Sequence, residues 1–490
     1  MSTLDKINEL NNRRNEIEKG GASGSNSARE RIANLLDTSS FVEMGAFITH
    51  RSTNYNLPEK ETPADGVVTG FGTVDGRLVY VYSQDATVIG GSIGEMGAKK
   101  IGKIYEQALK MGAPVIAILD SAGVRLQEGL DSMEGYGEIF KYQTMASGVI
   151  PQISVVLGDS LGINSIVPAL SDFVVMESKK ARMFVNSPST VNGTEAKKVD
   201  MKQAGSADFH ADNSGLVDFV YETEQECLNA VRELLGFIPS NNLEDAPLHG
   251  LADDLNRVDE VLNADNVDVR TLITTVADAG CFMEVKKAFA ENVITGFVRF
   301  NGYTAGVVAN SGELDGKACS KAVEFINICD AFNIPIVTFT NVKGYTADLK
   351  EEKKGFGKQI AKLVYSFTNA SVPKINVIVG QAFGSAYLAM NSKHIGADMV
   401  YAWPNAEISL MEAEAAVNVM YAEEVKKADK NEMIAKYKEE QSSPYTAAKR
   451  GYIDDIIVPA ETRKYLIVAL EMLESKRESR PAKKHSSIIL

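Results

Sequence analysis

Cysteine and histidine are scarce in this chain, which limits the chemistry that its side chains can supply. The 490 residues contain 4 cysteines and 5 histidines. No two cysteines form a CxxC pair and no two histidines stand at metal-ligand spacing, which argues against a zinc site or another metal centre. So few cysteines exclude a disulfide scaffold and indicate a reducing compartment, so we expect a cytoplasmic protein.

The sequence also lacks a long hydrophobic run. The longest uncharged stretch, residues 375–392, is interrupted by polar residues and glycines, whereas a membrane helix needs about 20 predominantly apolar residues. The N-terminus is charged and amphipathic, without the apolar core of a signal peptide. We therefore expect neither a membrane span nor a targeting segment.

Positive charge is in short supply as well. Lys and Arg number 51 against 65 Asp and Glu, a formal net charge of −14. This balance disfavours nucleic acid or an anionic membrane as a partner, and an anionic substrate would need a local cationic patch. The 44% apolar and 24% charged residues are typical of globular domains and exclude a disordered or collagenous chain.

What the sequence does contain is an internal repeat. Segments of the first half recur in the same order in the second: VTGF at 68–71 and ITGF at 294–297, APVI at 113–116 and IPIV at 334–337, PQISVVLG at 151–158 and PKINVIVG at 373–380, a glycine at 162 and 384, SDFVV at 171–175 and ADMVY at 397–401, GLVD at 215–218 and GYID at 451–454. The repeat predicts two domains, 1–245 and 255–490, joined by an acidic, turn-rich linker. The spacing lengthens before the last pair, which predicts an additional helix at 426–441 in the second half.

Each half alternates short apolar runs with helical stretches. Residues 78–83, 115–119, 153–157 and 173–176 have the length and β-branched content of buried strands, and residues 98–109 have the pattern of a helix. Apolar strands separated by helices indicate a mostly parallel sheet covered on both faces. We therefore predict a tandem α/β protein.

Two matched turns are the best candidates for chemistry. In both halves a strand is expected to end at a glycine, Gly158 or Gly380, and a small-residue turn with Gly162 or Gly384 leads into a helix. The first N–H groups of such a helix point to one spot and can hold a developing oxyanion. The loops at 120–125 and 341–345 follow the neighbouring strands, at the sheet edge where parallel sheets bind ligands. No nucleophile–base pair is legible, which leaves backbone amides as the working groups.

With these residues in view, the chain resembles the carboxyltransferase subunits of biotin-dependent acyl-CoA carboxylases and decarboxylases, in particular the propionyl-CoA carboxylase β-subunit and methylmalonyl-CoA decarboxylase α-subunit group. The resemblance covers nearly the whole chain and rests on these stretches: ARERI at 28–32, GSIGEM at 91–96, GVIPQIS at 148–154, DAFNIP at 330–335 and YAWP at 401–404. It implies two tandem crotonase-like domains, acyl-CoA on the first, and carboxybiotin on the second. It also implies a ring-shaped hexamer or a mixed oligomer, with biotin attached to a separate biotin carrier protein or biotin carboxylase subunit. A membrane decarboxylase subunit is left open as a further partner.

By motif position, the resemblance assigns the acyl-CoA oxyanion hole to the amides of Gly162 and Ile163 and the biotin-side hole to those of Ser385 and Ala386. Leu388 corresponds to a position that lines the acyl pocket. The remaining substrate-binding candidates lie in the glycine loops or are cations for the CoA phosphates: Gly123, Val124, Arg125, Gly344, Gly384, Lys99 and Lys100. For each cation, a structural or solvated role is the competing interpretation, and it is weighted more heavily.

The chain departs from the family pattern at the glycines of the site. Ile163 and Ser385 replace glycines, and the loop at 342–345 reads VKGY where the family has VPGF. A β-branched residue such as Ile163 resists a positive φ. These departures motivate a second hypothesis, a non-catalytic or partly degenerate subunit that assembles with an active paralogue. A crotonase-type hydratase or hydrolase is the third, and it needs an Asp or Glu beside Gly162.

Overall fold

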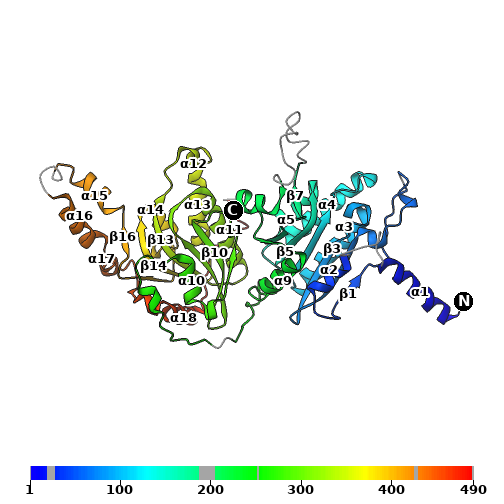
Figure 1. Ribbon diagram of the computed structural model, residues 1–490, viewed down its shortest axis with the longest axis horizontal. Coiled ribbons are helices and arrows are strands. Elements are labelled where there is room, and N and C mark those ends of the chain that lie inside the picture. Colours follow the sequence, from blue (N-terminus) through cyan, green and yellow to red (C-terminus); the bar gives the residue numbers. More distant parts are fainter. Residues whose placement is uncertain are drawn as a thin grey trace. The chain divides into compact units, whose positions relative to one another are not determined.

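The computed structural model describes residues 2–18, 28–53, 55–186, 205–250, 253–423 and 429–487. The chain divides into two compact units, Met1–Glu244 and Asp245–Leu490 (Figure 1). Each unit contains one sheet flanked by helices. The expected α/β class, with one mostly parallel sheet in each half, is confirmed.

The first unit is built on a sheet in the order β1-β2-β3-β4-β5-β6-β8, with β7 paired to the end of β5. Its strands are β1 (Val42–Met44), β2 (Val67–Val74), β3 (Arg77–Gln84), β4 (Val115–Ser121), β5 (Gln152–Leu161), β6 (Phe173–Glu177), β7 (Arg182–Phe184) and β8 (Phe219–Tyr221). Its helices are α1 (Thr3–Glu18), α2 (Ala28–Leu35), α3 (Glu95–Met111), α4 (Leu130–Ala146), α5 (Ile166–Ala169), α8 (Ala207–Phe209) and α9 (Glu224–Leu235).

The second unit repeats this order as β9-β10-β11-β13-β14-β15-β17, with β12 on β13 and β16 on β14. Its strands are β9 (Phe282–Val285), β10 (Val293–Phe300), β11 (Tyr303–Asn310), β12 (Gly312–Leu314), β13 (Ile336–Tyr345), β14 (Lys374–Phe383), β15 (Met399–Ala402), β16 (Glu407–Ser409) and β17 (Asp455–Ile456). Its helices are α10 (Val269–Val276), α11 (Gly316–Ala331), α12 (Leu349–Lys353), α13 (Phe356–Asn369), α14 (Gly384–Ala389), α15 (Ala413–Met420), α16 (Lys430–Tyr437), α17 (Pro444–Lys449) and α18 (Thr462–Leu473).

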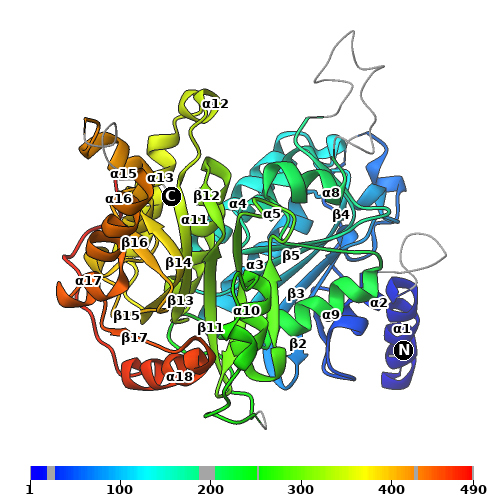
Figure 2. The same ribbon diagram turned by 60° about the vertical axis from the view of Figure 1, so that its left-hand side comes forward.

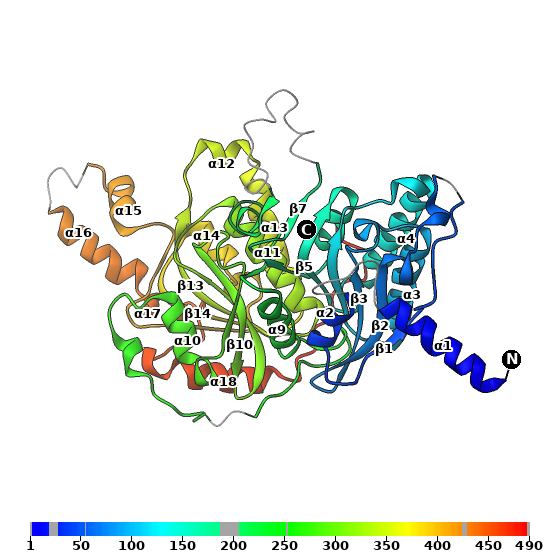
Figure 3. The same cartoon turned by 45° about the vertical axis from the view of Figure 1, so that its right-hand side comes forward.

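Successive residues of a strand face opposite sides of the sheet, so these apolar strands present apolar side chains on both faces. Helices cover these faces. In the first unit, Tyr80 and Tyr82 of β3 pack with Ile101 of α3 and Tyr136 of α4 in one apolar cluster. Helices α2 and α9 lie against the sheet of the first unit (Figure 2). In the second unit, α10 and α18 lie along the sheet in Figure 3. Leu272 of α10 and Leu466 of α18 belong to the same apolar cluster as residues of the strands.

Two differences from the predicted elements concern the repeat. The strands expected to end at Gly158 and Gly380 continue to Leu161 and Phe383, where each takes a new short partner strand. The helix expected at 426–441 is present as α16, followed by a turn of π-helix at Lys438–Ser442, and residues 424–428 lie outside the described part.

Repeated aspartates explain why two of the sequence matches persist. In each unit one aspartate accepts the N–H at the start of the long central strand, and another accepts the N–H of the strand beside it. A carboxylate that satisfies an N–H at a strand end replaces a missing ladder bond. The bonds are Asp172 to Gln152 (2.8 Å), Asp398 to Lys374 (2.8 Å), Asp218 to Val174 (2.7 Å) and Asp454 to Val400 (2.8 Å).

The repeat extends further toward the start of each unit than the sequence comparison indicated. Arg29 at the start of α2 pairs with Glu43 of β1 at 2.7 Å, and Arg270 of α10 pairs with Glu284 of β9 at 2.8 Å. Few letters match between residues 28–44 and 269–285, because most apolar positions there have exchanged one side chain for another. The signal that sequence alone could have offered is a set of identical residues at one constant offset: Arg29, Ile32, Asp37, Phe41 and Glu43 match Arg270, Ile273, Asp278, Phe282 and Glu284.

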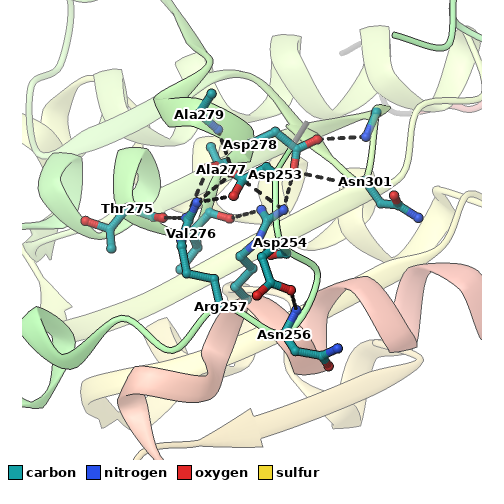
Figure 4. Close-up of polar contacts among 12 residues, drawn as sticks. Asp253, Asp254, Asn256, Arg257, Thr275, Val276, Ala277, Asp278, Ala279 and Asn301 are labelled. Carbon is teal, nitrogen blue, oxygen red and sulfur yellow. Dashed lines mark hydrogen bonds and ion pairs between the residues drawn. The ribbon is translucent and has the colours of Figure 1, made fainter. Parts of the chain in front are cut away.

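The same segments carry a carboxylate that holds the first hairpin of each unit. Asp37 accepts the N–H of Gly76 at 2.9 Å in the β2–β3 turn, and Asp278 accepts that of Gly302 at 2.7 Å in the β10–β11 turn. An arginine from the last helix of each unit neutralises the carboxylate: Arg232 at 2.9 Å and Arg463 at 2.5 Å. Figure 4 shows the polar network around Asp278 in the second unit.

Candidate functional site

Each candidate turn places its left-handed backbone on a glycine. Gly162 has φ +60° and Gly384 has φ +61°, and both begin short helical segments, Gly162–Ser165 and α14. Ile163 and Ser385 do not have positive φ. The obstacle expected from a β-branched residue at 163 therefore does not arise, because the preceding glycine takes the unusual conformation.

The surroundings of the first turn fit a role for backbone amides. A side chain at Gly162 would meet open space, so the backbone there is approachable. The Ile163 side chain is half-buried and packs against the apolar cluster that includes residues of α3 and α4. Gly123, with φ +101°, lies so close that an added Cβ would stand 2.9 Å from the Leu161 carbonyl oxygen. Val124 forms a parallel bridge to Ile93, which joins this loop to the segment before α3.

The second turn also has positive φ on its glycine, and its next residue is more exposed than Ile163. Ser385 is exposed, Ala386 is buried, and the Leu388 side chain is 40% exposed on the same short helix. Gly344 has φ +150° near the end of the neighbouring strand β13, so the loop expected at 341–345 is part of this strand. The Tyr345 hydroxyl donates to the Ser385 carbonyl at 3.2 Å and joins the end of β13 to the turn.

Two of the cations expected at the CoA phosphates have structural partners instead. Arg125 has no exposed surface, and its guanidinium pairs with Asp65 and, at 2.9 Å, with Glu128. Lys100 is 4% exposed, and its ammonium donates to the backbone carbonyls of Ala64 and Val67. Neither cationic group can bind an external phosphate, because both are buried and already hydrogen-bonded inside the protein. Their burial and internal partners support the competing structural interpretation for these two residues.

Lys99 differs from its neighbour. Its side chain is 44% exposed, and its ammonium pairs with Glu95 one turn earlier on α3, at 2.5 Å. An exposed pair of this kind contributes little stability and exchanges readily with solvent or a ligand. Lys99 is thus the one member of the three predicted cations that remains accessible.

Lys100 gives a prediction about pH and stability. Burial lowers the pKa of Lys100 to about 7, whereas a lysine in an unfolded chain titrates near about 10.4. Between these values the unfolded chain binds the additional proton, so the lysine makes the free energy of unfolding rise with pH. Below about pH 7 both states are protonated and its contribution is constant.

We therefore expect Lys100→Met to flatten this rise by up to about 1.4 kcal/mol per pH unit between about pH 7 and 10. Urea unfolding followed by circular dichroism at several pH values measures the slope. Lys99→Met, which removes an exposed ammonium from the same helix, serves as the matched control and should keep the wild-type slope. Equal slopes for Lys100→Met and the wild type would contradict the assignment.

Two further structural findings concern metal binding and membrane spans. No three His, Cys, Asp or Glu side chains gather as a metal site among the residues that the structure describes. Within the same residues, no helix combines the length and apolar character that crossing a membrane requires.

Comparison with known proteins identifies the class. The family model of the carboxyl transferase domain matches residues 20–488, so the chain belongs to this family. It is 46% identical to the methylmalonyl-CoA decarboxylase subunit alpha of Veillonella parvula, over 97% of this chain and 95% of the relative. It is 42% identical to the propionyl-CoA carboxylase carboxyltransferase subunit of Haloferax mediterranei, with both chains covered completely. The chain is therefore a carboxyltransferase subunit.

A solved structure agrees with this assignment. The transcarboxylase 12S crystal structure with methylmalonyl-coenzyme A and methylmalonic acid bound matches with a TM-score of 0.96 and 41% identity, covering 100% of this chain and 99% of that one. That protein is described as a hexamer assembly. The match confirms the predicted fold of two tandem crotonase-like domains.

Proposed function

We propose that this chain moves a carboxyl group between carboxybiotin on a separate carrier protein and a short-chain acyl-CoA, with propionyl-CoA and methylmalonyl-CoA favoured. The observation that carries the proposal is the match over 100% of the chain to a 12S structure with methylmalonyl-coenzyme A bound. The duplicated glycine turns supply the chemistry, because each can stabilise one anion without an ionisable side chain.

In this proposal the first turn serves the acyl-CoA. The amides of Gly162 and Ile163 occupy the first positions of a helical turn, where N–H groups have no intrahelical acceptor. They would donate to the thioester oxygen, which gains negative charge when the α-carbon becomes an enolate. Gly123 and Val124 would form the neighbouring wall, and Lys99 would face the CoA phosphates.

The second turn serves the biotin. The amides of Ser385 and Ala386 stand in the first turn of α14 and would donate to the ureido oxygen. Gly384 gives that turn its conformation, Gly344 would keep the adjoining end of β13 free of a side chain, and Leu388 would offer an apolar contact. Biotin, when bound, supplies the ureido nitrogen that carries the carboxyl group and takes up the α-proton.

The partners follow from this chemistry. A biotin carrier protein or biotin carboxylase subunit would deliver the biotin, and the names of the carboxylase relatives support such a partner. We also propose a hexamer, supported by the hexamer of the 12S relative. A membrane subunit would be the partner if the chain works as a decarboxylase. Three buried thiols, Cys227, Cys319 and Cys329, support a cytoplasmic location.

The competing functions have less support. The named relatives are enzyme subunits, which does not favour a non-catalytic paralogue. A hydratase would need a carboxylate beside Gly162. The nearest in sequence is Asp159, which pairs with Arg182 at 2.9 Å, and Asp120 near the end of β4 pairs with Arg31 at 3.0 Å.

The test is decarboxylation of methylmalonyl-CoA by the purified full chain in the presence of free biotin, followed by loss of the carboxylated thioester. Turnover that depends on biotin is the expected result, and the same reaction without biotin is the control. No turnover alone, with activity restored by a paralogous subunit, would instead establish the non-catalytic function.

Ile163→Gly is expected to retain or raise the kcat of this reaction. The proposed working group at 163 is its N–H, which glycine keeps, and Ile163 does not need the φ that Gly162 already supplies. The kcat of the folded variant, measured with its thermal unfolding, checks this. Loss of all activity in a folded protein would remove the amide of residue 163 from the proposed hole.

A further inference from the structure

The strand that leads into each glycine turn is bulged at the same place. Leu119 of β4 faces Val156 of β5 and Ser121 faces Ser160, so Asp120 alone lies opposite residues 157–159. In the second unit Thr340 faces Ile378 and Val342 faces Ala382, so Asn341 alone lies opposite residues 379–381. Extra residues in one strand bend it and change the direction of the residues beyond the bulge.

At the bulge each strand changes the neighbour on its other side, from β6 to β7 in the first unit and from β15 to β16 in the second. The last three residues of β5, which end at Leu161, pair with β7, and the last three of β14, which end at Phe383, pair with β16. Gly162 and Gly384 come next in the chain. The bulge therefore sets the direction of the strand end that precedes each glycine turn.

One polar side chain fills each bulge. The Asp120 Oδ1 atom accepts the N–H of Asp159 at 3.2 Å, and the Asn341 Oδ1 atom accepts the N–H of Gln381 at 3.0 Å. Each side chain replaces the ladder bond that the bulge has broken. The N–H of Asp120 and that of Asn341 are held in turn by Gln84 and Asn310, each at 3.0 Å.

The glycine in each bulge makes room for this side chain. A Cβ built on Gly158 would stand 2.1 Å from Asp120 Oδ1, and one on Gly380 would stand 2.5 Å from Asn341 Oδ1. No side chain fits at such distances, so Gly158 and Gly380 are required by the polar side chains opposite them. These glycines do not take part in the turns themselves.

We propose that Asp120 and Asn341 are equivalent positioning residues, which hold the two bulges and thereby aim the amides of the Gly162 and Gly384 turns. The inference rests on the proposed function, because it gives these amides their role. The side chains at this position differ in charge between the two units. Asp120 brings a carboxylate that Arg31 neutralises at 3.0 Å, with Glu224 of α9 as the second partner of Arg31, whereas Asn341 is neutral.

The experiment compares three variants of the full chain. Asp120→Ala removes the acceptor, and Asp120→Asn keeps an acceptor of the kind that Asn341 already provides. Asp172→Ala is the matched control, because Asp172 accepts the N–H of Gln152 at 2.8 Å at the opposite end of the same strand. Steady-state kinetics with methylmalonyl-CoA and free biotin, thermal unfolding and amide hydrogen exchange are measured for each.

We expect Asp120→Ala to lower kcat by about 10- to 100-fold with a change in KM of less than about threefold, because a small misplacement of the donors is felt chiefly in the transition state. Exchange at the amides of Asp159 and Ile163 should accelerate. Asp120→Asn should restore kcat to within about threefold of the wild type. Asp172→Ala should lower the thermal midpoint and leave both kcat and these two amides near wild-type values.

The inference is overturned if folded Asp120→Ala keeps kcat and the exchange of Ile163 within about twofold of the wild type, or if Asp172→Ala lowers kcat equally. A wild-type chain without any transfer activity would instead contradict the proposed function. The exchange of Ile163 in Asp120→Ala would then decide the inference by itself, because it reports the position of the turn without any reaction.

Discussion

Replacement of Gly162 by valine is expected to lower kcat for carboxyl transfer by at least about 100-fold in a protein that remains folded. Gly162 has φ +60°, where a β-branched residue is a steric outlier that costs about 1–2 kcal/mol or more. The chain can relieve this strain by rotating the backbone, and the rotation turns the following amide away from the proposed oxyanion. Loss of one such donor costs about 100- to 1,000-fold in kcat.

The control for this variant is Gly137→Val. Both glycines have open space where a Cβ would stand, but Gly137 lies within α4 and does not have a positive φ. The two substitutions therefore add the same side chain and differ only in the backbone they require. We expect Gly137→Val to keep wild-type kcat. A folded Gly162→Val variant with undiminished kcat would exclude this turn as an oxyanion hole.

Arg463→Met is expected to have the largest effect on stability, a loss of about 3 kcal/mol or more from the free energy of unfolding of the second unit. Arg463 has no exposed surface and donates to the Val276 carbonyl at 2.7 Å as well as to Asp278. Without it the buried Asp278 carboxylate, which is labelled in Figure 4, loses its counter-charge. Breaking a buried pair on one side is far more costly than removing both partners.

The single tryptophan of the chain makes this measurement specific to the second unit. Trp403 is buried and donates to the Thr462 hydroxyl at 3.0 Å, next to Arg463. Its fluorescence during urea unfolding should show a transition at clearly lower urea in Arg463→Met. Arg232→Met is the matched control, because Arg232 plays the same part beside Asp37 but is 26% exposed and lies in the first unit, so the Trp403 transition should stay at the wild-type urea concentration. An equal shift of the Trp403 transition in both variants would contradict the assignment of the loss to the buried pair of the second unit.

The outcome for the cations shows where reasoning from sequence stops. Lys99, Lys100 and Arg125 were candidates of equal standing, because a sequence shows charge but not burial. The fold turns Lys100 inward, onto the carbonyls of Ala64 and Val67, and surrounds Arg125 with acids. The same turn of α3 leaves Lys99 exposed, because adjacent residues on a helix point about 100° apart.

Ile163 was expected to resist a positive φ, but the backbone of the turn does not require one from it. A loop motif gives residues in order but does not say which of them carries the positive φ. The structure assigns it to Gly162 and Gly384, so Ile163 and Ser385 keep ordinary backbones. The partly degenerate site suggested by these substitutions therefore has no support from the backbone of either turn.

The sequence by itself determined the tandem organisation, the mostly parallel sheets implied by alternating elements, and the family, because these depend on apolar patterning and on matched segments along the chain. It also located the two glycine turns. Only the tertiary structure decided that Asp120 and Asn341 fill matching bulges, that Asp37 and Asp278 hold matching hairpins, and that two of the three predicted cations are internal. Each of these depends on which residues of distant strands meet, and a hydrogen bond across a sheet leaves no periodic trace in the sequence of either partner.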